Sequence, residues 1–557
     1  MRVLVDGHPH DLRQEDFVAA GGQGRVYARG DIAFKIFDDA SATPPRAKLQ
    51  ALRALAGPHV AAPDRAVTDT QGAVIGYTMP FFRGAHSWAQ LCTPAFRRRA
   101  GIDDAAALGL VHSLGAALTA IHAHGSLVVD LSENNVLVRG REVCLIDLDS
   151  WQTPQHRATA LTPSIASPHV PTGHFDVSTD WFAFAVLTST LLLGIHPFKG
   201  KHPRIKGLAA RMRAGVSVFD PSVRLPAVCR DPSSVPRPLA RWLRSALESG
   251  ASTVPPLGRL PTPTRRPAAA AQGHRYPEAI RWVLVEPNAA IVATTTRAFE
   301  DAQCWHDDAR PLRALGRTAE GHPYVLQEGP DGLQARVRGL DARVRVDLRT
   351  DDLLSHEGRV FARTRGRLVE LQVRLVGARP VLLTREVARV LPLATQLFPG
   401  VALQNVLGTW RASWLGRPDG SPQVELPIEA SAQVLDARRA GDRLVVLSQR
   451  DRVISRDVYT LGHDGAVRTH ARDANVDPWG TTFVQRGEMY VEVGSVGLNA
   501  VGRSPPDPWP ALEGPLDALD LHTDGHRLLA TAGSVLRDVT PRSVGRERLG
   551  FDASRCR

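Results

Sequence analysis

The sequence predicts a multidomain protein in which an α+β domain, residues 1–251, is followed by an all-β domain, residues 275–557. A chain of 557 residues is too long for one hydrophobic core, so two or more domains are expected. Residues 252–274 hold five prolines among Ser, Thr, Arg and Ala, which is typical of a linker. Strand-like and helical patterns alternate before this linker, whereas mainly short strand-like runs recur after it.

Composition is that of an ordinary globular protein, with 43% hydrophobic and 22% charged residues. The net charge of +11 comes mostly from arginines spread along the whole chain, so no nucleic-acid partner is expected. The five cysteines stand far apart without a CxxC pair, which favours neither a zinc site nor a disulfide framework. The N-terminus lacks the pattern of a signal peptide. The most apolar stretch, residues 181–195, is shorter than the ~20 residues that span a bilayer, and it predicts a buried helix. We therefore expect a cytoplasmic protein with no membrane segment.

The first candidate binding element is a cluster of glycines between two strand-like segments in residues 17–37. Gly21, Gly22 and Gly24 lie in its turn, where small residues let backbone N–H groups approach phosphate oxygens closely. Lys35 follows within Ile-Ala-Phe-Lys and is one of only five lysines in the chain. This rarity favours a phosphate ligand over a solvated strand lysine.

Three further elements lead to the next candidate segment. Residues 45–56 carry leucines at helical spacing and predict a helix. Residues 74–82 then predict a strand. Residues 110–121 again show helical spacing, and Gly125 is expected to end that helix.

Residues 127–149 carry the most specific chemical pattern, two apolar runs that flank an Arg-Gly-Arg-Glu turn. The first run places Asp130 and Asn135 five residues apart, and the second run reaches Asp147. Phosphoryl transfer needs a carboxylate that orients the attacking hydroxyl and two oxygen ligands for Mg²⁺. One hairpin would supply all three groups.

This pattern resembles the catalytic loop and the metal-binding strand of the protein-kinase superfamily. The resemblance continues in order over about residues 10–250, and it includes the glycine turn, Lys35, Asp180 and the Gly-Ile-His-Pro-Phe-Lys-Gly run at 194–200. The chain is most similar to a divergent bacterial branch, often encoded with a PP2C-type phosphatase and a von Willebrand A protein. The resemblance implies a bilobal α+β fold, ATP and Mg²⁺ as cofactors, and protein Ser/Thr residues as substrates.

The resemblance also implies roles for individual residues. Asp130 would be the catalytic residue, and Asn135 and Asp147 would bind the metal. Asp180 would cap the backbone of the catalytic loop. Met79 and Leu137 would lie against adenine, which the backbone around Phe81 would hydrogen-bond. The full set of nucleotide-binding positions is Gly21, Gly22, Gly24, Val26, Ala33, Lys35, Met79, Phe81 and Leu137.

Several positions depart from the superfamily pattern. No glutamate occurs between Glu15 and Glu133, so the helix residue that usually pairs with the strand lysine is missing. Three further replacements are Val129 for arginine, Ser132 for lysine and Asp149 for glycine. These departures leave open an ATP-binding pseudokinase that acts as a regulatory scaffold. A small-molecule phosphotransferase ranks third, because such enzymes usually lack the His-Pro-Phe region.

The C-terminal domain shows a turn followed by a strand of period two, about seven times in about 280 residues. Residues 440–447, 486–491 and 523–530 read as versions of one hairpin. This recurrence predicts a β-propeller, with two packed β-sandwiches as the alternative. No catalytic pattern stands out in this domain, so we expect it to bind a protein partner.

Overall fold

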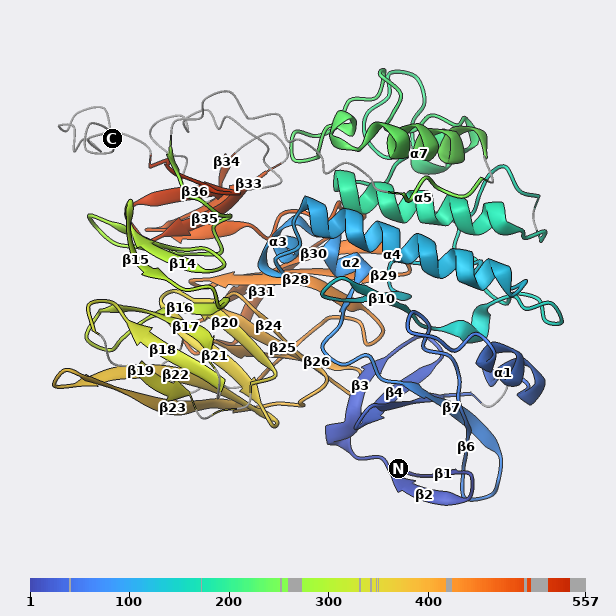
Figure 1. The fold of residues 1–557 in the computed structure, drawn as a ribbon, viewed down its shortest axis with the longest axis horizontal. Coiled ribbons are helices and arrows are strands. Elements are labelled where there is room, and N and C mark those ends of the chain that lie inside the picture. The colour runs from blue at the N-terminus through green and yellow to red at the C-terminus, as the bar shows by residue number, and fades with distance from the viewer. Residues whose placement is uncertain are drawn as a thin grey trace.

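The computed structural model describes residues 1–39, 42–171, 173–250, 253–258, 273–329, 332–340, 343–346, 348, 350–416, 423–494, 498–501 and 519–540. Figure 1 shows a sheet beside the N-terminus, a group of helices above it, and a series of sheets formed by the C-terminal half.

The N-terminal part is a seven-stranded antiparallel sheet in the order β2-β1-β6-β7-β5-β4-β3. Its elements are β1 (Arg2–Val5), β2 (His8–Asp11), η1 (Gln14–Asp16), β3 (Phe17–Ala20), β4 (Gly24–Arg29), β5 (Ile32–Phe37), α1 (Arg46–Arg53), β6 (Ala66–Thr68) and β7 (Val74–Pro80). Lys35 in the interior strand β5 lies opposite Val26 of β4 and Tyr77 of β7. Directly opposite residues share a face of the sheet, so these three side chains are neighbours.

The helical part follows the sheet. Its elements are β8 (His86–Ser87), α2 (Trp88–Leu91), α3 (Pro94–Arg99), α4 (Asp104–Ala123), β9 (Val136–Arg139), β10 (Glu142–Leu145), η3 (Leu148–Ser150), α5 (Val177–Leu193), α6 (Leu208–Arg213), η4 (Pro232–Ser234) and α7 (Arg237–Ser249). Helix α5 is mainly apolar, and nearly all of its residues are buried. The Asp176 side chain caps its start, and Gly194 ends it in the left-handed conformation. The predicted buried helix at residues 181–195 is therefore confirmed.

Helix α4 is the one helix within the described residues that is long and apolar enough to cross a membrane. It instead packs against α5 and β10. Leu110, Leu114 and Leu118 are fully buried and belong to the main hydrophobic cluster. In this fold α4 is therefore a core helix.

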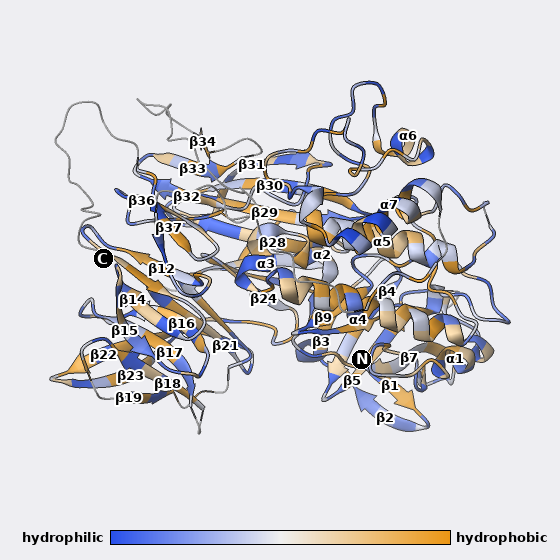
Figure 2. Ribbon diagram, turned by 45° about the horizontal axis from the view of Figure 1, so that its top comes forward, coloured by the Kyte–Doolittle hydropathy of each residue, from blue (hydrophilic) through white to orange (hydrophobic). Residues whose placement is uncertain are grey.

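The C-terminal part is all-β within the described residues, as the sequence predicts. Its antiparallel sheets are β12-β13-β14-β15, β16-β17-β18-β19, β20-β21-β22-β23, β24-β25-β26-β27, β28-β29-β30-β31, β32-β33-β34 and β11-β37-β36-β35. Apolar and polar residues are mixed along strands such as β22 and β23 (Figure 2), as expected of strands with a buried and an exposed face.

The bounds of these strands are β11 (His274–Arg275), β12 (Trp282–Val285), β13 (Ala290–Ala293), β14 (Arg297–Glu300), β15 (Gln303–Asp307), β16 (Leu312–Arg317), β17 (Pro323–Gly329), β18 (Gly332–Val337), β19 (Arg343–Val346), β20 (Asp352–His356), β21 (Arg359–Thr364), β22 (Arg367–Val376), β23 (Arg379–Arg389), β24 (Thr395–Phe398), β25 (Val401–Val406), β26 (Thr409–Trp414), β27 (Val424–Leu426), β28 (Gln433–Ala440), β29 (Arg443–Arg450), β30 (Val453–Leu461), β31 (Val467–Ala474), β32 (Phe483–Arg486), β33 (Met489–Val493), β34 (Leu498–Val501), β35 (Leu519–Thr523), β36 (Leu528–Ala532) and β37 (Val535–Asp538).

These sheets follow one another around a closed circle. The first strands of successive sheets contact each other in the order β12, β16, β20, β24, β28, β32 and β35, and β35 contacts β12 again. Strand β11, which precedes the first sheet in sequence, pairs with β37 in the last sheet. The first and the last described strands of the C-terminal part are therefore joined in one sheet.

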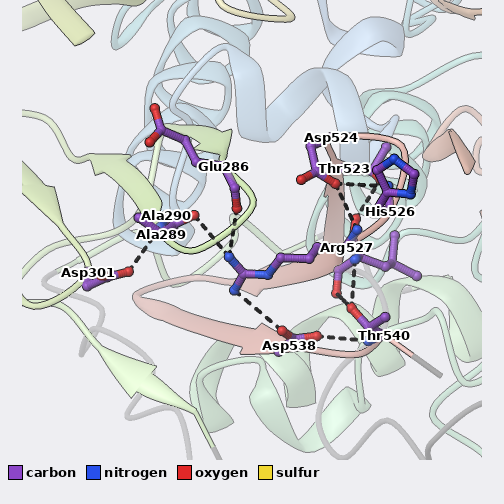
Figure 3. Close-up of polar contacts among 11 residues, drawn as sticks. Glu286, Ala289, Ala290, Asp301, Thr523, Asp524, His526, Arg527, Asp538 and Thr540 are labelled. Atoms are coloured by element: carbon purple, nitrogen blue, oxygen red, sulfur yellow. Dashed lines mark hydrogen bonds and ion pairs between the residues drawn. The ribbon is translucent and has the colours of Figure 1, made fainter. Parts of the chain in front are cut away.

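Arg527, in the turn between β35 and β36, adds a second connection across this junction (Figure 3). Its guanidinium donates to the carbonyl oxygens of Glu286 (2.8 Å) and Ala289 (3.1 Å) in the turn after β12. It also forms an ion pair with Asp538 of β37 at 3.4 Å. One side chain thus ties the last sheet to the first.

The helical part and the C-terminal part share a continuous hydrophobic core. Phe96 of α3 lies 6.5 Å from Phe398 of β24, between ring centroids, and both belong to one buried cluster. Gln90 of α2 donates to the side chain of Gln396 (2.8 Å) and to the carbonyl of Val434 (3.2 Å). The two parts are therefore packed together, although most of the predicted linker, residue 252 and residues 259–272, lies outside the described residues.

The shared core adds a second expectation to the result of limited proteolysis, namely that the two fragments stay associated. The proline-rich composition of residues 252–274 predicts first cleavage there, which gives fragments of about 250 and 280 residues. Because the two fragments share a core, we expect them to co-elute in size-exclusion chromatography after cleavage and to separate only in denaturant. First cleavage within either half, with residues 252–274 protected, would contradict the linker prediction.

Candidate functional site

The site is built on the hairpin of β9 and β10, whose two ends carry the predicted metal ligands. Asn135 directly precedes β9, and Asp147 follows β10. The Ile146 N–H donates to the Asn135 carbonyl at 3.0 Å and holds the two ends together. The Asn135 side-chain amide donates to the Asp130 carbonyl at 3.3 Å. The structure therefore brings Asp130, Asn135 and Asp147 together, as the sequence predicts.

The loop before Asp130 is held by Asp180 of helix α5. The Asp180 carboxylate is fully buried and accepts from the backbone N–H groups of Val128 (2.9 Å) and Val129 (2.7 Å). His122 Nε2 lies 2.9 Å from the same carboxylate. The predicted capping role of Asp180 is confirmed.

This capping maintains an unusual backbone conformation. Val129 has a φ of 63°, in the left-handed region that a β-branched residue rarely adopts. Asp147 has a φ of 66°. Such conformations cost free energy and persist only where the surroundings enforce them, typically at functional sites. Val129, beside Asp130, and Asp147, a predicted metal ligand, are thus fixed by their surroundings.

The Asp130 carboxylate holds a threonine. Asp130 Oδ1 accepts from the Thr162 backbone N–H at 2.9 Å and from the Thr162 hydroxyl at 2.6 Å. Thr162 belongs to the segment between η3 and α5, 32 residues further along the chain. The structure therefore demonstrates that an aliphatic hydroxyl can reach this carboxylate.

Lys35 is buried and bound to two carboxylates. Its Nζ donates to Asp149 Oδ1 at 2.6 Å and also forms a short ion pair with Asp147. The Tyr77 hydroxyl donates to the same Asp149 oxygen at 2.7 Å. Asp149 therefore gives Lys35 the buried carboxylate partner that the sequence lacks on helix α1. The sequence pattern did not predict this role, although it holds one signal for it, an aspartate two residues after Asp147 where the kinase pattern has glycine.

The charges of this group depend on one another. Burial alone would lower the pKa of Lys35, but the carboxylates of Asp147 and Asp149 raise it above its ordinary value. Burial would raise the pKa of Asp149, yet the Lys35 ammonium and the Tyr77 hydroxyl lower it overall. The pKa of Asp147 is raised by partial burial, and the neighbouring Asp149 and Asp130 carboxylates add to this effect while Lys35 opposes it. The surplus of carboxylates at this point favours a bound cation.

An apolar surface adjoins the charged group. Ala33 lies opposite Met79 across β5 and β7, on the same face as Lys35. Ala33 and Met79 share a hydrophobic cluster with three of the other predicted nucleotide-binding residues, Val26, Phe81 and Leu137. The Phe81 N–H already donates to the Asp31 carbonyl at 2.8 Å, and the Phe81 carbonyl accepts from Arg83 at 3.1 Å. Phe81 therefore contributes its ring here, and its predicted backbone bond to adenine stays a prediction.

The three glycines of the turn differ in whether a larger residue could replace them. A Cβ at Gly24 would lie 2.2 Å from the Ile36 carbonyl, so only glycine fits there. A Cβ at Gly21 would meet only the Gly24 carbonyl at 3.8 Å, and one at Gly22 would meet nothing within 4 Å. Gly21 and Gly22 thus leave open space beside the turn, as close approach of a ligand requires.

No group of three or more His, Cys, Asp or Glu side chains suited to a metal occurs within the described residues. Mg²⁺ commonly uses one or two protein oxygens together with waters and substrate phosphates. The side chains of Asn135 and Asp147 fit that pattern, and the Asp147 side chain is 40% exposed.

Replacement of Asp147 by Asn should weaken nucleotide binding in the presence of Mg²⁺, because a charged metal ligand becomes neutral. Calorimetric titration with ATP, with and without Mg²⁺, measures the effect. Asp38→Asn is a matched control, since its side chain is 54% exposed. Equal ATP affinities for the wild type and Asp147→Asn under both conditions would contradict the metal assignment.

The C-terminal part reaches this site through Arg452, in the hairpin turn between β29 and β30. The Arg452 guanidinium donates to the Ser164 hydroxyl at 2.9 Å and lies 3.3 Å from the Glu133 carboxylate. Glu133 stands between Asp130 and Asn135 in sequence, and both partners of this ion pair are about nine-tenths buried. The all-β part therefore supports the Asp130 loop directly, which sequence patterns did not indicate.

Replacement of Arg452 by Ala should destabilise the protein, because it leaves the Glu133 carboxylate buried without its cation. Breaking a buried ion pair in this way typically costs about 3–5 kcal/mol. Thermal unfolding of the full chain measures the loss. Arg450→Ala, in the same hairpin but with a side chain 52% exposed, should change stability little. Equal melting temperatures for the two variants would contradict the role of Arg452.

Comparison with protein-family models and with curated proteins finds no match for this chain.

Proposed function

We propose that this protein transfers the γ-phosphoryl group of ATP to serine or threonine hydroxyls of proteins. The single observation that carries the proposal is the Thr162 hydroxyl, bound at 2.6 Å to a carboxylate whose loop also carries a candidate metal ligand. A hydroxyl in that position is oriented for attack and can pass its proton to the carboxylate.

The proposed roles follow from the geometry of the site. Asp130 would orient the substrate hydroxyl and accept its proton. Lys35 would bind nucleotide phosphates, and Asp149 would hold Lys35 in place. The apolar surface that includes Ala33 and Met79 would receive the adenine ring. Mg²⁺, held by Asn135 and Asp147, would neutralise phosphate charge.

The arrangement of the elements supports a protein-kinase-like fold for the first 250 residues. An antiparallel sheet with one helix precedes a helical part. In the candidate site, Lys35 comes from the sheet and Asp130 comes from the helical part. The closed circle of sheets supports a seven-bladed β-propeller, whose β11–β37 pairing closes the ring. Two β-sandwiches would supply two pairs of facing sheets instead.

We further propose a cytoplasmic location and a protein partner on the propeller. A PP2C-type phosphatase and a von Willebrand A protein are the candidates that the family resemblance suggests. Co-purification of tagged full-length chain with each candidate tests these partners separately.

One observation favours the second candidate function, an ATP-binding pseudokinase. The chain's own residues already occupy the site, because Thr162 covers the Asp130 carboxylate and Lys35 is paired with Asp147 and Asp149. Phosphoryl transfer therefore requires Thr162 to leave or to be the acceptor itself.

Incubation of the full chain with radiolabelled ATP and Mg²⁺, alone and with a Ser/Thr-rich carrier protein, tests the proposal. Labelled protein with phosphoserine or phosphothreonine is the expected result. Clear ATP binding without any transfer would favour the pseudokinase, and the absence of both would reject the two functions together.

A further inference from the structure

A cavity of about 420 Å³ lies between the helical part and the all-β part. The turn from α3 to α4 forms one wall, and β35, β36 and residues 279–281 form the other. None of the residues assigned to the candidate phosphoryl-transfer site lines it. Its volume falls within the range of about 300–1,000 Å³ typical of small-molecule sites, which often lie between domains.

The lining of this cavity is rich in arginine. Its charged residues are Arg97, Arg98, Arg99, Arg230, Arg281, Asp103, Asp104 and Asp520. Asp104 already accepts from Arg97 at 3.1 Å and pairs with Arg230, and Asp520 accepts from Arg438 at 2.9 Å. The lining thus holds five arginines and three aspartates, two of which are already bound to guanidinium groups, while Arg99 pairs with the buried Asp436 outside the lining.

Arg281 is the lining residue whose charge is least compensated. Its guanidinium donates to the Arg99 carbonyl at 3.0 Å, and no carboxylate in the described part of the chain pairs with it. Burial lowers the pKa of Arg281. A partly buried cation without a counter-ion costs free energy, which an anion in the cavity would recover.

The turn between α3 and α4 is shaped to admit this side chain. Gly101 has a φ of 71°, and a Cβ there would lie 2.0 Å from Arg281 Nη1. Glycine therefore permits both the turn and the position of the guanidinium. On the other wall, burial lowers the pKa of His522 to about 4, so its imidazole is neutral at pH 7.

We propose that this cavity binds a small anion with two or more carboxylate or phosphate groups. The planar guanidinium of Arg281 would bind one oxyanion group through paired N–H donors, the arrangement that arginine forms with both groups. The second carboxylate or phosphate group of the ligand would lie near the guanidinium of Arg98 or Arg230, which also line the cavity. Such a ligand would contact both parts of the chain and stabilise their junction.

Thermal unfolding of the full chain without Mg²⁺, with pyrophosphate or citrate as probe, tests this proposal and distinguishes phosphate from carboxylate ligands. A bound probe at a large excess over its dissociation constant should raise the melting temperature by a few degrees. Arg281→Gln should abolish the shift, and without probe it should be no less stable than the wild type. Lys35→Ala should keep the shift, so the result does not depend on phosphoryl transfer.

Three outcomes would overturn the proposal. They are no shift with either probe, a shift retained in Arg281→Gln, and an Arg281→Gln protein less stable than the wild type without probe. The last would mean that the charge of Arg281 is already compensated within the chain. A shift lost in Lys35→Ala but kept in Arg281→Gln would place the probe at the other site.

Discussion

Replacement of Asp130 by Asn should lower the rate of phosphoryl transfer by a factor of about 10²–10⁴, the usual contribution of a positioned general base. The carboxylate accepts the Thr162 hydroxyl, and an amide in its place could still accept a hydrogen bond but could not take the proton. ATP affinity should stay almost unchanged, because this side chain need not touch the nucleotide. Initial rates with radiolabelled ATP, together with calorimetric ATP binding, measure both quantities.

The control for this experiment is Asp64→Asn, an exposed carboxylate in the N-terminal sheet region whose side chain is 45% exposed. It should leave rate and affinity unchanged. Transfer that survives Asp130→Asn at the wild-type rate would reject the assigned role of Asp130. A rate and an affinity that fall together would indicate that Asp130 acts through the nucleotide instead.

Local patterns predicted much of the candidate site. The five-residue spacing of Asp130 and Asn135, and the strand that leads to Asp147, required only that two adjacent segments form a hairpin. That hairpin is present, with Leu137 opposite Cys144. In the structure Val26, Ala33 and Lys35 lie on one face, because β4 and β5 are joined by a short turn that fixes their register.

The partners of the site were not predictable in the same way, because they come from distant parts of the chain. Asp149 lies 114 residues from Lys35, and Arg452 lies 288 residues from Ser164. Nothing in the spacing of these residues reveals that they meet. In sequence Asp149 is only a departure from the glycine of the kinase pattern, and the fold shows that it supplies the carboxylate that helix α1 lacks.

The same reasoning applies to the all-β part. Recurrent turn–strand patterns predicted its strands, since alternation is a local property. The circular order of the sheets depends on contacts between β12 and β35 and on the pairing of β11 with β37. Residues about 260 apart form that pairing, for example His274 with Leu536. The closure was therefore beyond what periodicity could establish.

Replacement of Lys35 by Ala should both weaken ATP binding and destabilise the protein. Lys35 is proposed to contact the phosphates both in the ATP complex before reaction and in the transition state. Its loss should therefore lower ATP affinity and the rate of transfer together. The Asp149 carboxylate, with a side chain only 7% exposed, would also lose its cation. Removing one partner of a buried ion pair typically costs about 3–5 kcal/mol.

The destabilisation by Lys35→Ala should depend on pH in a defined direction. In the wild type the pKa of Asp149 is below its ordinary value, so this pair stabilises the fold above pH ~4, and the contribution is lost as pH falls through the folded pKa. Without Lys35 the buried carboxylate has a raised pKa, and its penalty declines as pH falls toward ~4. The difference in melting temperature between wild type and variant should therefore be largest near pH 7 and shrink at lower pH.

Lys48→Met provides the matched control for this test, because Lys48 of helix α1 is also buried but its Nζ has no hydrogen-bond partner within the described residues. Burial lowers the pKa of Lys48 and outweighs its attraction to the Asp149 carboxylate, so loss of this charge should destabilise the fold far less than loss of Lys35. Melting temperatures of the three proteins between pH 4 and 7, with ATP titrations at pH 7, measure the whole set of effects. A Lys35→Ala protein as stable as Lys48→Met at every pH, with unchanged ATP affinity, would reject both the Lys35–Asp149 pairing and the proposed phosphate contact.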